Sequence, residues 1–248
     1  MKQILIVPLL FFFCFAGHGM ANESIVFAID PTKAPMQFVA SNGEVVGFEI
    51  DFLYEMGRQA DFTPVLKQVP WQGIFKGLGS GEYDAVFASV SITDQRKETM
   101  DFTIPYYTIA QAVLILADQD FKKWSDLKGK NVGVKNKTTS LQTTRNLQGV
   151  NIVVFNSVPN AIESLHEKQV DAVICDGPIA GHYAMVEKND LKIAFVLKPK
   201  NAEFYGIAVK KGNNALKNTL NKAISSVQNN NTDIILQKKW FSGLLKTR

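Results

Sequence analysis

Short apolar runs alternate along the chain with longer segments in which apolar residues recur at helical spacing. Residues 25–29 form an apolar run that stops at Asp30 and Pro31, as buried strands do. In residues 48–60, apolar side chains return every three or four positions, which predicts a helix with one buried face. Strand and helix patterns keep alternating to the end of the chain, so the sequence predicts an α/β fold with helices packed on mostly parallel sheets.

The expected elements fall into two successive groups with a similar layout. We expect strands at residues 25–29, 65–66, 84–88, 131–134, 152–155, 170–175, 193–197 and 205–209, and a hairpin at 38–46 that turns at Asn42-Gly43. We expect helices at residues 48–60, 71–78, 93–99, 138–147, 161–168, 178–186, 214–228 and 232–240. The glycine-rich residues 77–81 follow a helix pattern and precede a strand, which favours a helix end over a nucleotide-binding loop.

The first 21 residues have the pattern of a signal peptide. Lys2 precedes the 13 apolar residues 4–16, and the small residues Gly19 and Ala21 stand at positions −3 and −1 before Asn22. A membrane anchor is the alternative, but a bilayer-spanning helix needs about 20 apolar residues. We therefore expect cleavage near Ala21 and a periplasmic protein, secreted across the inner membrane.

Composition and charge exclude several classes of protein. The chain has 27 Lys and Arg against 23 Asp and Glu, a net charge of +4, and its basic residues are scattered, so we expect no nucleic-acid partner. Its two Cys and three His are too few and too dispersed for a metal cluster, and we expect no metal and no other cofactor. Cys175 would be the only cysteine after cleavage, so the fold would depend on its apolar core.

A set of short motifs resembles the extracytoplasmic polar amino-acid-binding proteins of ABC importers, solute-binding protein family 3. The motifs occur in family order and cover the chain after the signal peptide. They are residues 42–51, 71–74, 81–85, 91–96, 101–103, 105–107, 127–130, 132–134 and 170–173, with Asp176.

This resemblance implies a two-lobed α/β fold, the type II periplasmic-binding-protein fold, with the ligand in the cleft between hinge-linked lobes. After the signal peptide at residues 1–21, the first lobe would comprise residues 22–110 and 205–248. The second would comprise residues 111–204. The crossovers would lie near residues 109–112 and 200–205. Lobes joined in this way close on a ligand as hinged rigid bodies.

Arg96 is the candidate for binding the ligand carboxylate, because its planar guanidinium makes two parallel hydrogen bonds that Lys cannot make. Thr138 and Thr139 open a predicted helix, whose free N–H groups attract anions. The resemblance assigns Arg96 and Thr139 to the carboxylate from opposite lobes. The alternatives are that Arg96 pairs with a surface carboxylate and that Thr138 only caps its helix.

The resemblance assigns the ligand ammonium to Asp176, helped by Ser91 and the backbone carbonyl of Ser89. A buried site must neutralise both charges of a free amino acid, since an unpaired buried charge is costly. The alternative is that Asp176 caps the helix that begins near Pro178.

Four residues bear on the ligand side chain. Trp71 would pack on it, or be an ordinary core residue. Asp30 stands at the end of the first strand, where α/β sheets place ligands, and suggests a cationic or amide group. Lys33 replaces a family aromatic residue and would favour an anionic or hydroxylated group, pair with Asp30, or point to water. Lys137 replaces a family glycine and would be strained if its φ is positive.

We therefore expect a non-catalytic protein that binds a free polar amino acid and delivers it to the membrane permease of an ABC transporter, acting as a monomer. A periplasmic enzyme on the same scaffold, similar to cyclohexadienyl dehydratase, is one alternative. A ligand-sensing module for a separate receptor is the other.

Overall fold

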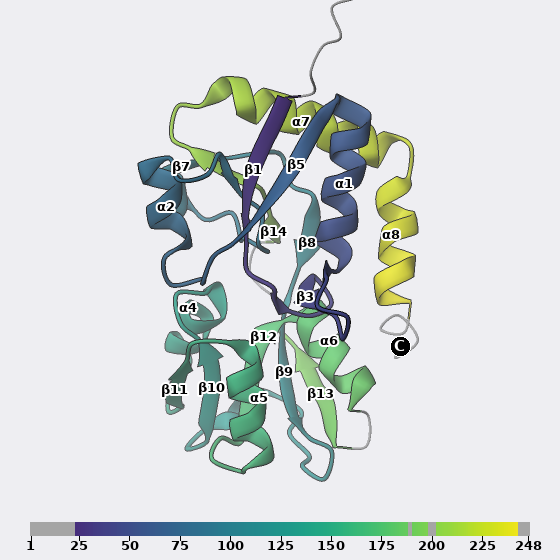
Figure 1. Cartoon of the computed structure of the whole chain (residues 1–248). Helices are drawn as coiled ribbons and strands as arrows, with labels where there is room; N and C mark the ends of the chain where they lie inside the picture. Colours follow the sequence, from purple (N-terminus) through teal and green to yellow (C-terminus); the bar gives the residue numbers. More distant parts are fainter. Residues whose placement is uncertain (1–22, 188–189, 198–201, 243–248) are drawn as a thin grey trace, which may run out of the picture.

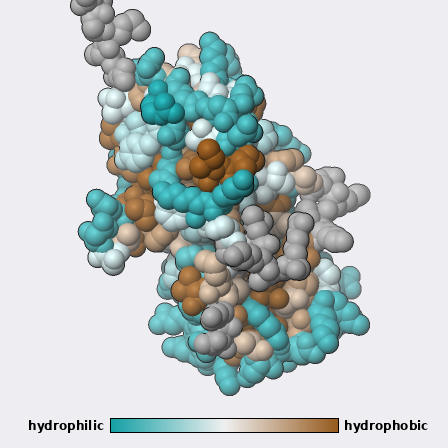
Figure 2. Space-filling model, turned by 90° about the vertical axis from the view of Figure 1, so that its right-hand side faces the viewer, coloured by the Kyte–Doolittle hydropathy of each residue, from teal (hydrophilic) through white to brown (hydrophobic). Residues whose placement is uncertain are grey.

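The computed structural model describes residues 23–187, 190–197 and 202–242, and the predicted signal peptide lies outside them. The chain builds two five-stranded sheets, each covered by helices, one above the other (Figure 1). We call the sheet that contains the N-terminal strand, with its helices, the first lobe, and the other sheet with its helices the second lobe. Seen from the side that carries the C-terminal helix, the surface is mostly hydrophilic with a few hydrophobic patches (Figure 2).

The first lobe has the strand order β5-β1-β6-β15-β7. Its strands are β1 (Glu23–Ile29), β5 (Phe62–Gln68), β6 (Ala85–Val86), β7 (Met100–Phe102) and β15 (Ala208–Lys210). Its helices are α1 (Phe48–Ala60), α2 (Ile74–Ser80), α3 (Asp94–Lys97), α7 (Asn214–Asn229) and α8 (Thr232–Phe241). β1 runs parallel to β5 and β6, whereas β15, which returns late in the chain, is antiparallel to β6.

The α1 helix forms over the residues that its periodicity predicts, because its apolar positions Phe48, Phe52, Leu53 and Met56 are fully buried. Gly47 precedes it with φ 138, and a Cβ there would lie 2.2 Å from the Met36 carbonyl oxygen. Only glycine allows this close approach. The approach holds α1 against a small sheet made of β2 (Thr32–Lys33), β3 (Gln37–Val39) and β4 (Val45–Val46).

The second lobe repeats this layout with the strand order β11-β10-β12-β9-β13. Its strands are β9 (Gln111–Leu116), β10 (Asn131–Lys135), β11 (Asn151–Phe155), β12 (Ala172–Asp176) and β13 (Leu191–Val196). Its helices are the 3₁₀ helix η1 (Trp124–Leu127), α4 (Thr139–Arg145), α5 (Val158–His166) and α6 (Gly177–Val186). β10 is parallel to β11 and β12, and β9 is antiparallel to β12.

Two short strands carry the chain between the lobes. β8 (Tyr107–Ile109) leads into the second lobe, and β14 (Glu203–Tyr205) leads back to the first. They pair antiparallel with Tyr107 opposite Tyr205, and they lie between the two sheets (Figure 1). The crossover expected at 200–205 contains β14, whereas the one expected at 109–112 shares only Ile109 with β8 and continues into β9. Residues 200 and 201 lie outside the described part of the chain.

Several element boundaries differ from the sequence prediction. The helix expected at 71–78 begins at Ile74, because Trp71 to Gly73 form a turn. The strand expected at 65–66 extends over Phe62–Gln68, because it pairs with β1 along its whole length. The single strand expected at 205–209 is two strands, since the chain leaves the crossover and enters the first sheet after Gly206. The helix expected to end near residue 147 ends at Arg145.

Candidate functional site

The carboxyl ends of parallel strands in both lobes meet at one pocket. Asp30 follows β1, Ser89 and Ser91 follow β6, Lys135 ends β10, and Asp176 ends β12. Open α/β sheets bind ligands at this edge. Eight of the nine predicted site residues line the pocket, namely Lys33, Trp71, Ser89, Ser91, Arg96, Thr138, Thr139 and Asp176. The ninth, Asp30, is hydrogen-bonded to a further pocket residue, Lys135.

Trp71 forms a wall of the pocket and is also part of the core. Its side chain is 3% exposed and packs in a buried cluster of the first lobe. Its indole Nε1 donates to the carbonyl oxygen of Asn136 in the second lobe at 3.1 Å. The core interpretation and the binding interpretation of Trp71 are therefore compatible.

Arg96 makes hydrogen bonds to carbonyl oxygens of both lobes. Its guanidinium donates to Ser91 at 2.7 Å and to Lys137 at 3.2 Å. Burial lowers the pKa of Arg96 to about 10, with the Asp176 charge opposing the shift. In the part of the chain that the structure describes, no carboxylate forms a salt bridge with Arg96, so the surface-pair alternative is wrong there. Its charge remains available to an anion in the pocket.

The two threonines at the start of α4 have different roles. The Thr138 hydroxyl donates to the Lys135 carbonyl oxygen at 2.7 Å and accepts from the Leu141 N–H at 3.3 Å, so this side chain caps the helix. The Thr139 hydroxyl lies 3.3 Å from that of Ser91, across the two lobes. Lys137 has φ +58, the left-handed conformation that disfavours a lysine.

Asp176 does not cap α6. One carboxylate oxygen accepts from Gln111 Nε2 at 2.7 Å and the other from the Tyr205 hydroxyl. Although Asp176 stands at the N-cap position, its side chain makes no capping hydrogen bond. Gln111 also donates to Glu203 at 3.2 Å, and burial raises the pKa of that half-buried acid. The sequence analysis missed Gln111, Tyr205 and Glu203, whose proximity depends on the crossover strands.

A buried acid holds the loop that carries the two serines. Ser89 has φ +50, and its N–H and hydroxyl donate to one Glu49 oxygen at 2.8 and 2.9 Å. The Tyr106 hydroxyl donates to the same oxygen. Glu49 is fully buried in α1, and burial raises its pKa. These hydrogen bonds stabilise the unusual backbone of Ser89.

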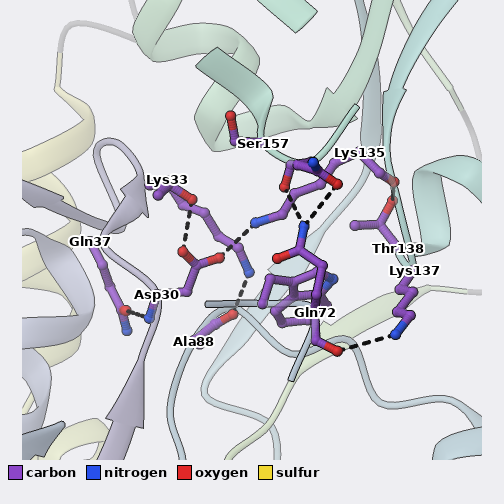
Figure 3. Close-up of polar contacts among 12 residues, drawn as sticks. Asp30, Lys33, Gln37, Gln72, Ala88, Lys135, Lys137, Thr138 and Ser157 are labelled. Atoms are coloured by element: carbon purple, nitrogen blue, oxygen red, sulfur yellow. Dashed lines mark hydrogen bonds and ion pairs between the residues drawn. The ribbon is translucent and has the colours of Figure 1, made fainter. Parts of the chain in front are cut away.

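Asp30, Lys33 and Lys135 form a buried charge cluster at the pocket (Figure 3). Lys135 Nζ lies 2.6 Å from Asp30 Oδ2, and Lys33 Nζ donates to the Ala88 carbonyl oxygen at 2.5 Å. Burial by itself raises the pKa of Asp30, but the charges of Lys33 and Lys135 outweigh it and lower the pKa below its usual value. Burial, followed by the Lys135 charge, lowers the pKa of Lys33 to about 7. Lys135 could have been found from the sequence, since it ends a strand as Asp30 does.

Further polar contacts hold the lobes together at the rim of the pocket. Gln72 Nε2 donates to the Asn156 carbonyl oxygen at 3.0 Å, and Lys137 Nζ donates to the Gln72 carbonyl oxygen at 3.1 Å (Figure 3). Gln142 donates to Gln95 at 3.1 Å. With the Trp71 and Arg96 contacts, they describe lobes that are closed on each other.

Two other classes of site are absent from the described ranges. No group of three or more His, Cys, Asp and Glu residues there is arranged to hold a metal ion. No helix there is long and apolar enough to cross a membrane. Cys175 is buried and lines the pocket, and burial raises the pKa of its thiol.

Comparisons with known proteins agree with this architecture. The solved structure of an ancestral arginine-binding protein bound to arginine superposes with a TM-score of 0.83 at 32% identity, covering 89% of this chain and 99% of that one. This likeness confirms the two-lobed periplasmic-binding-protein fold. A probable histidine-binding protein of Neisseria gonorrhoeae is 34% identical over 92% of this chain and 87% of its own length. The L-cystine-binding protein TcyJ of Escherichia coli strain K12 is 29% identical over 92% and 88%. Residues 25–243 match the bacterial extracellular solute-binding proteins, family 3, and the chain belongs to this family.

Proposed function

We propose that this protein binds a free polar amino acid between its lobes, outside the cytoplasm, and delivers it to the membrane permease of an ABC transporter. The carrying observation is that Arg96 and Asp176, two partly buried groups of opposite charge, line one pocket. Relatives named for histidine, cystine and arginine binding support an amino-acid ligand.

The ligand carboxylate binds Arg96 and the ligand ammonium binds Asp176. Each ligand charge then has an opposite charge and directional hydrogen bonds, which offsets the cost of removing it from water. The Ser91 and Thr139 hydroxyls, 3.3 Å apart, add hydrogen bonds from opposite lobes. The Ser89 carbonyl oxygen is a further acceptor for the ammonium.

Closure follows from the placement of these groups. Arg96 belongs to the first lobe, and Asp176 and Thr139 belong to the second. A ligand that contacts all three binds the closed form more tightly than the open one and shifts the population toward it. We place the lobe boundaries at residues 22–110 with 205–248, and 111–204, with β8 and β14 as the hinge.

The export route and partners complete the proposal. Residues 1–21 direct the chain across the inner membrane and are cleaved near Ala21, and the mature protein acts as a periplasmic monomer. The permease recognises the closed, ligand-bound form. The ligand leaves unchanged, so no turnover of a bound amino acid is expected.

A melting scan against the twenty amino acids tests the function. The protein is unfolded and refolded first, to remove any ligand that copurifies. At 100 times Kd, a ligand stabilises the folded protein by about 2.7 kcal/mol, which raises Tm by several degrees. The shift should vanish in Arg96→Ala and Asp176→Ala and persist in the control Lys76→Gln, which changes an exposed residue of α2. If no amino acid raises Tm, the proposal is wrong.

A further inference from the structure

The charge cluster of Lys33, Lys135 and Asp30 has two basic groups and one acid. Lys33 and Lys135 line the pocket, and Asp30 is hydrogen-bonded to Lys135. All three residues are at most 4% exposed. Charges in such surroundings are costly unless they are paired, so the pairing within the cluster constrains the ligand.

Asp30 is paired with Lys135. Their charged atoms are 2.6 Å apart, a charge-assisted hydrogen bond between buried groups. The other Asp30 oxygen accepts from the Thr32 hydroxyl at 2.8 Å. Asp30 therefore neutralises one of the two lysines.

Lys33 is the cation in excess. The described residues give its Nζ one hydrogen bond, to the neutral Ala88 carbonyl oxygen, and it lies 3.9 Å from the centre of the Trp71 ring (Figure 3). Two other acids also act on the Lys33 charge: Asp176, which lines the pocket and is the proposed partner of the ligand ammonium, and the buried Glu49. Glu49 does not line the pocket, and one of its oxygens is occupied by Ser89 and Tyr106. Glu49 can lower the cost of a charge on Lys33 but cannot take the place of a ligand group in the pocket.

From this arrangement we propose that the ligand is an acidic amino acid, aspartate or glutamate, whose side-chain carboxylate binds Lys33 and Lys135. This inference rests on the proposed function, because it assumes that the α-carboxylate binds Arg96. The acidic side chain supplies the missing negative charge and accepts hydrogen bonds from both ammonium groups. A ligand with a cationic side chain, as in the arginine-binding relatives, would add a third positive charge beside two lysines.

The distance across the pocket agrees with a short dicarboxylate. Lys33 Nζ lies 3.9 Å and Arg96 Cζ 5.5 Å from the centre of the Trp71 ring, so the two are at most 9.4 Å apart. Aspartate and glutamate carry carboxylates separated by about 3 to 5 Å along their carbon chains. Adding a hydrogen bond of about 3 Å at each end gives about 9 to 11 Å. Only the short end of this range, an aspartate or a bent glutamate, fits within the limit of 9.4 Å. Cystine, with a disulfide between its two halves, is too long for this span in an extended form.

Isothermal titration calorimetry on the refolded protein tests the assignment with matched ligands. Glutamate and aspartate are compared with glutamine and asparagine, which have the same shape without the charge, and with arginine, histidine and cystine. We expect one acid to bind at least about tenfold more tightly than its amide, and arginine and histidine to bind more weakly than either. Equal or tighter binding of an amide, arginine, histidine or cystine overturns this inference while leaving the amino-acid-binding function intact. Binding of none of the twenty amino acids overturns both.

Variants of the cluster separate a charge effect from a loss of structure. Lys33→Gln should lower the affinity for the acid about tenfold or more and remove the preference for acid over amide. Asp30→Asn should act in the opposite direction and raise that preference, because it leaves two unneutralised lysines. Lys76→Gln, the same change at an exposed site, should leave the preference unaltered. A Lys33→Gln protein that melts normally and keeps its preference for the acid would overturn the proposal.

Discussion

Lys135 and Asp30 form a buried ion pair that joins the two lobes, with 2.6 Å between Nζ and Oδ2. Lys135 ends β10 of the second sheet, and Asp30 follows β1 of the first. The pair is therefore a contact between the lobes as well as part of the pocket.

Removal of one member of this pair should destabilise the protein. Asp30→Asn leaves Lys135 without its charge partner, which should lower the free energy of unfolding by about 3 kcal/mol. The double variant Asp30→Asn/Lys135→Gln should recover part of this loss. Urea unfolding of the four proteins in the cycle measures the coupling. Additive losses from the two substitutions would show that the pair contributes no coupling energy.

Arg96→Ala should affect ligand binding and stability in opposite directions. The ligand loses its bidentate partner, so affinity should fall by about 100-fold or more. The free protein loses a partly buried cation whose hydrogen bonds go to neutral carbonyl oxygens, and its Tm should stay equal or rise. Calorimetric titration and thermal melting measure the two effects. A drop in Tm of several degrees with unchanged affinity would instead indicate a structural role.

Binding of an acidic ligand should take up protons at alkaline pH. Lys33 has a pKa of about 7 in the folded protein, because burial and then Lys135 lower it, while Asp30, Glu49 and Asp176 oppose them. A bound carboxylate restores the charge on Lys33, so affinity for the acid should fall as pH rises above about 7. Affinity for the matched amide should change less. Titrations at pH 8 in buffers of different ionisation enthalpy count the protons, and the uptake should disappear in Lys33→Gln.

The lowered pKa of Lys33 should also make the stability of the folded protein depend on pH. Lys33 titrates near its usual value of 10.5 in the unfolded chain and about 7 in the folded one. At pH values between about 7 and 10.5, Lys33 is protonated in the unfolded chain but not in the folded one. The contribution of Lys33 to stability therefore rises with pH over this range. Below about pH 7 both states are protonated, and the contribution is at its minimum. Comparing the pH dependence of urea unfolding for the native chain and Lys33→Gln isolates the contribution of Lys33 to stability. Parallel curves would contradict the lowered pKa.

Gly47→Ala should disturb the start of α1. The new Cβ would lie 2.2 Å from the Met36 carbonyl oxygen, and φ 138 is unfavourable for alanine. We expect a loss of at least about 2 kcal/mol of stability. Gly79→Ala is the matched control, because no atom lies within 4 Å of its Cβ position in α2. That change should be neutral or stabilising by up to about 1 kcal/mol. Similar melting of the two variants would show that the close approach at Gly47 is relaxed at little cost.

Local patterns were sufficient for most of the secondary structure. The periodicity of residues 48–60 predicted α1 with both ends correct, because its buried face depends only on residues three and four apart. The single strand expected at 205–209 was wrong. β14 and β15 are adjacent in sequence but pair with β8 and β6, which belong to different sheets. No local sequence pattern indicates which distant strand a segment pairs with.

The candidate site also combines residues that the sequence predicts with contacts that only the folded chain brings together. The sequence by itself determined most of the element types and, through motifs shared with a family, predicted Arg96 and Asp176 as the charged groups for an amino acid. It left open whether Asp30 pairs with Lys33. Only the tertiary structure shows that Asp30 pairs with Lys135, 105 positions away, because contact between the lobes brings the two together. A net charge in a pocket is a sum over groups close in space, and which groups are close is a property of the folded chain.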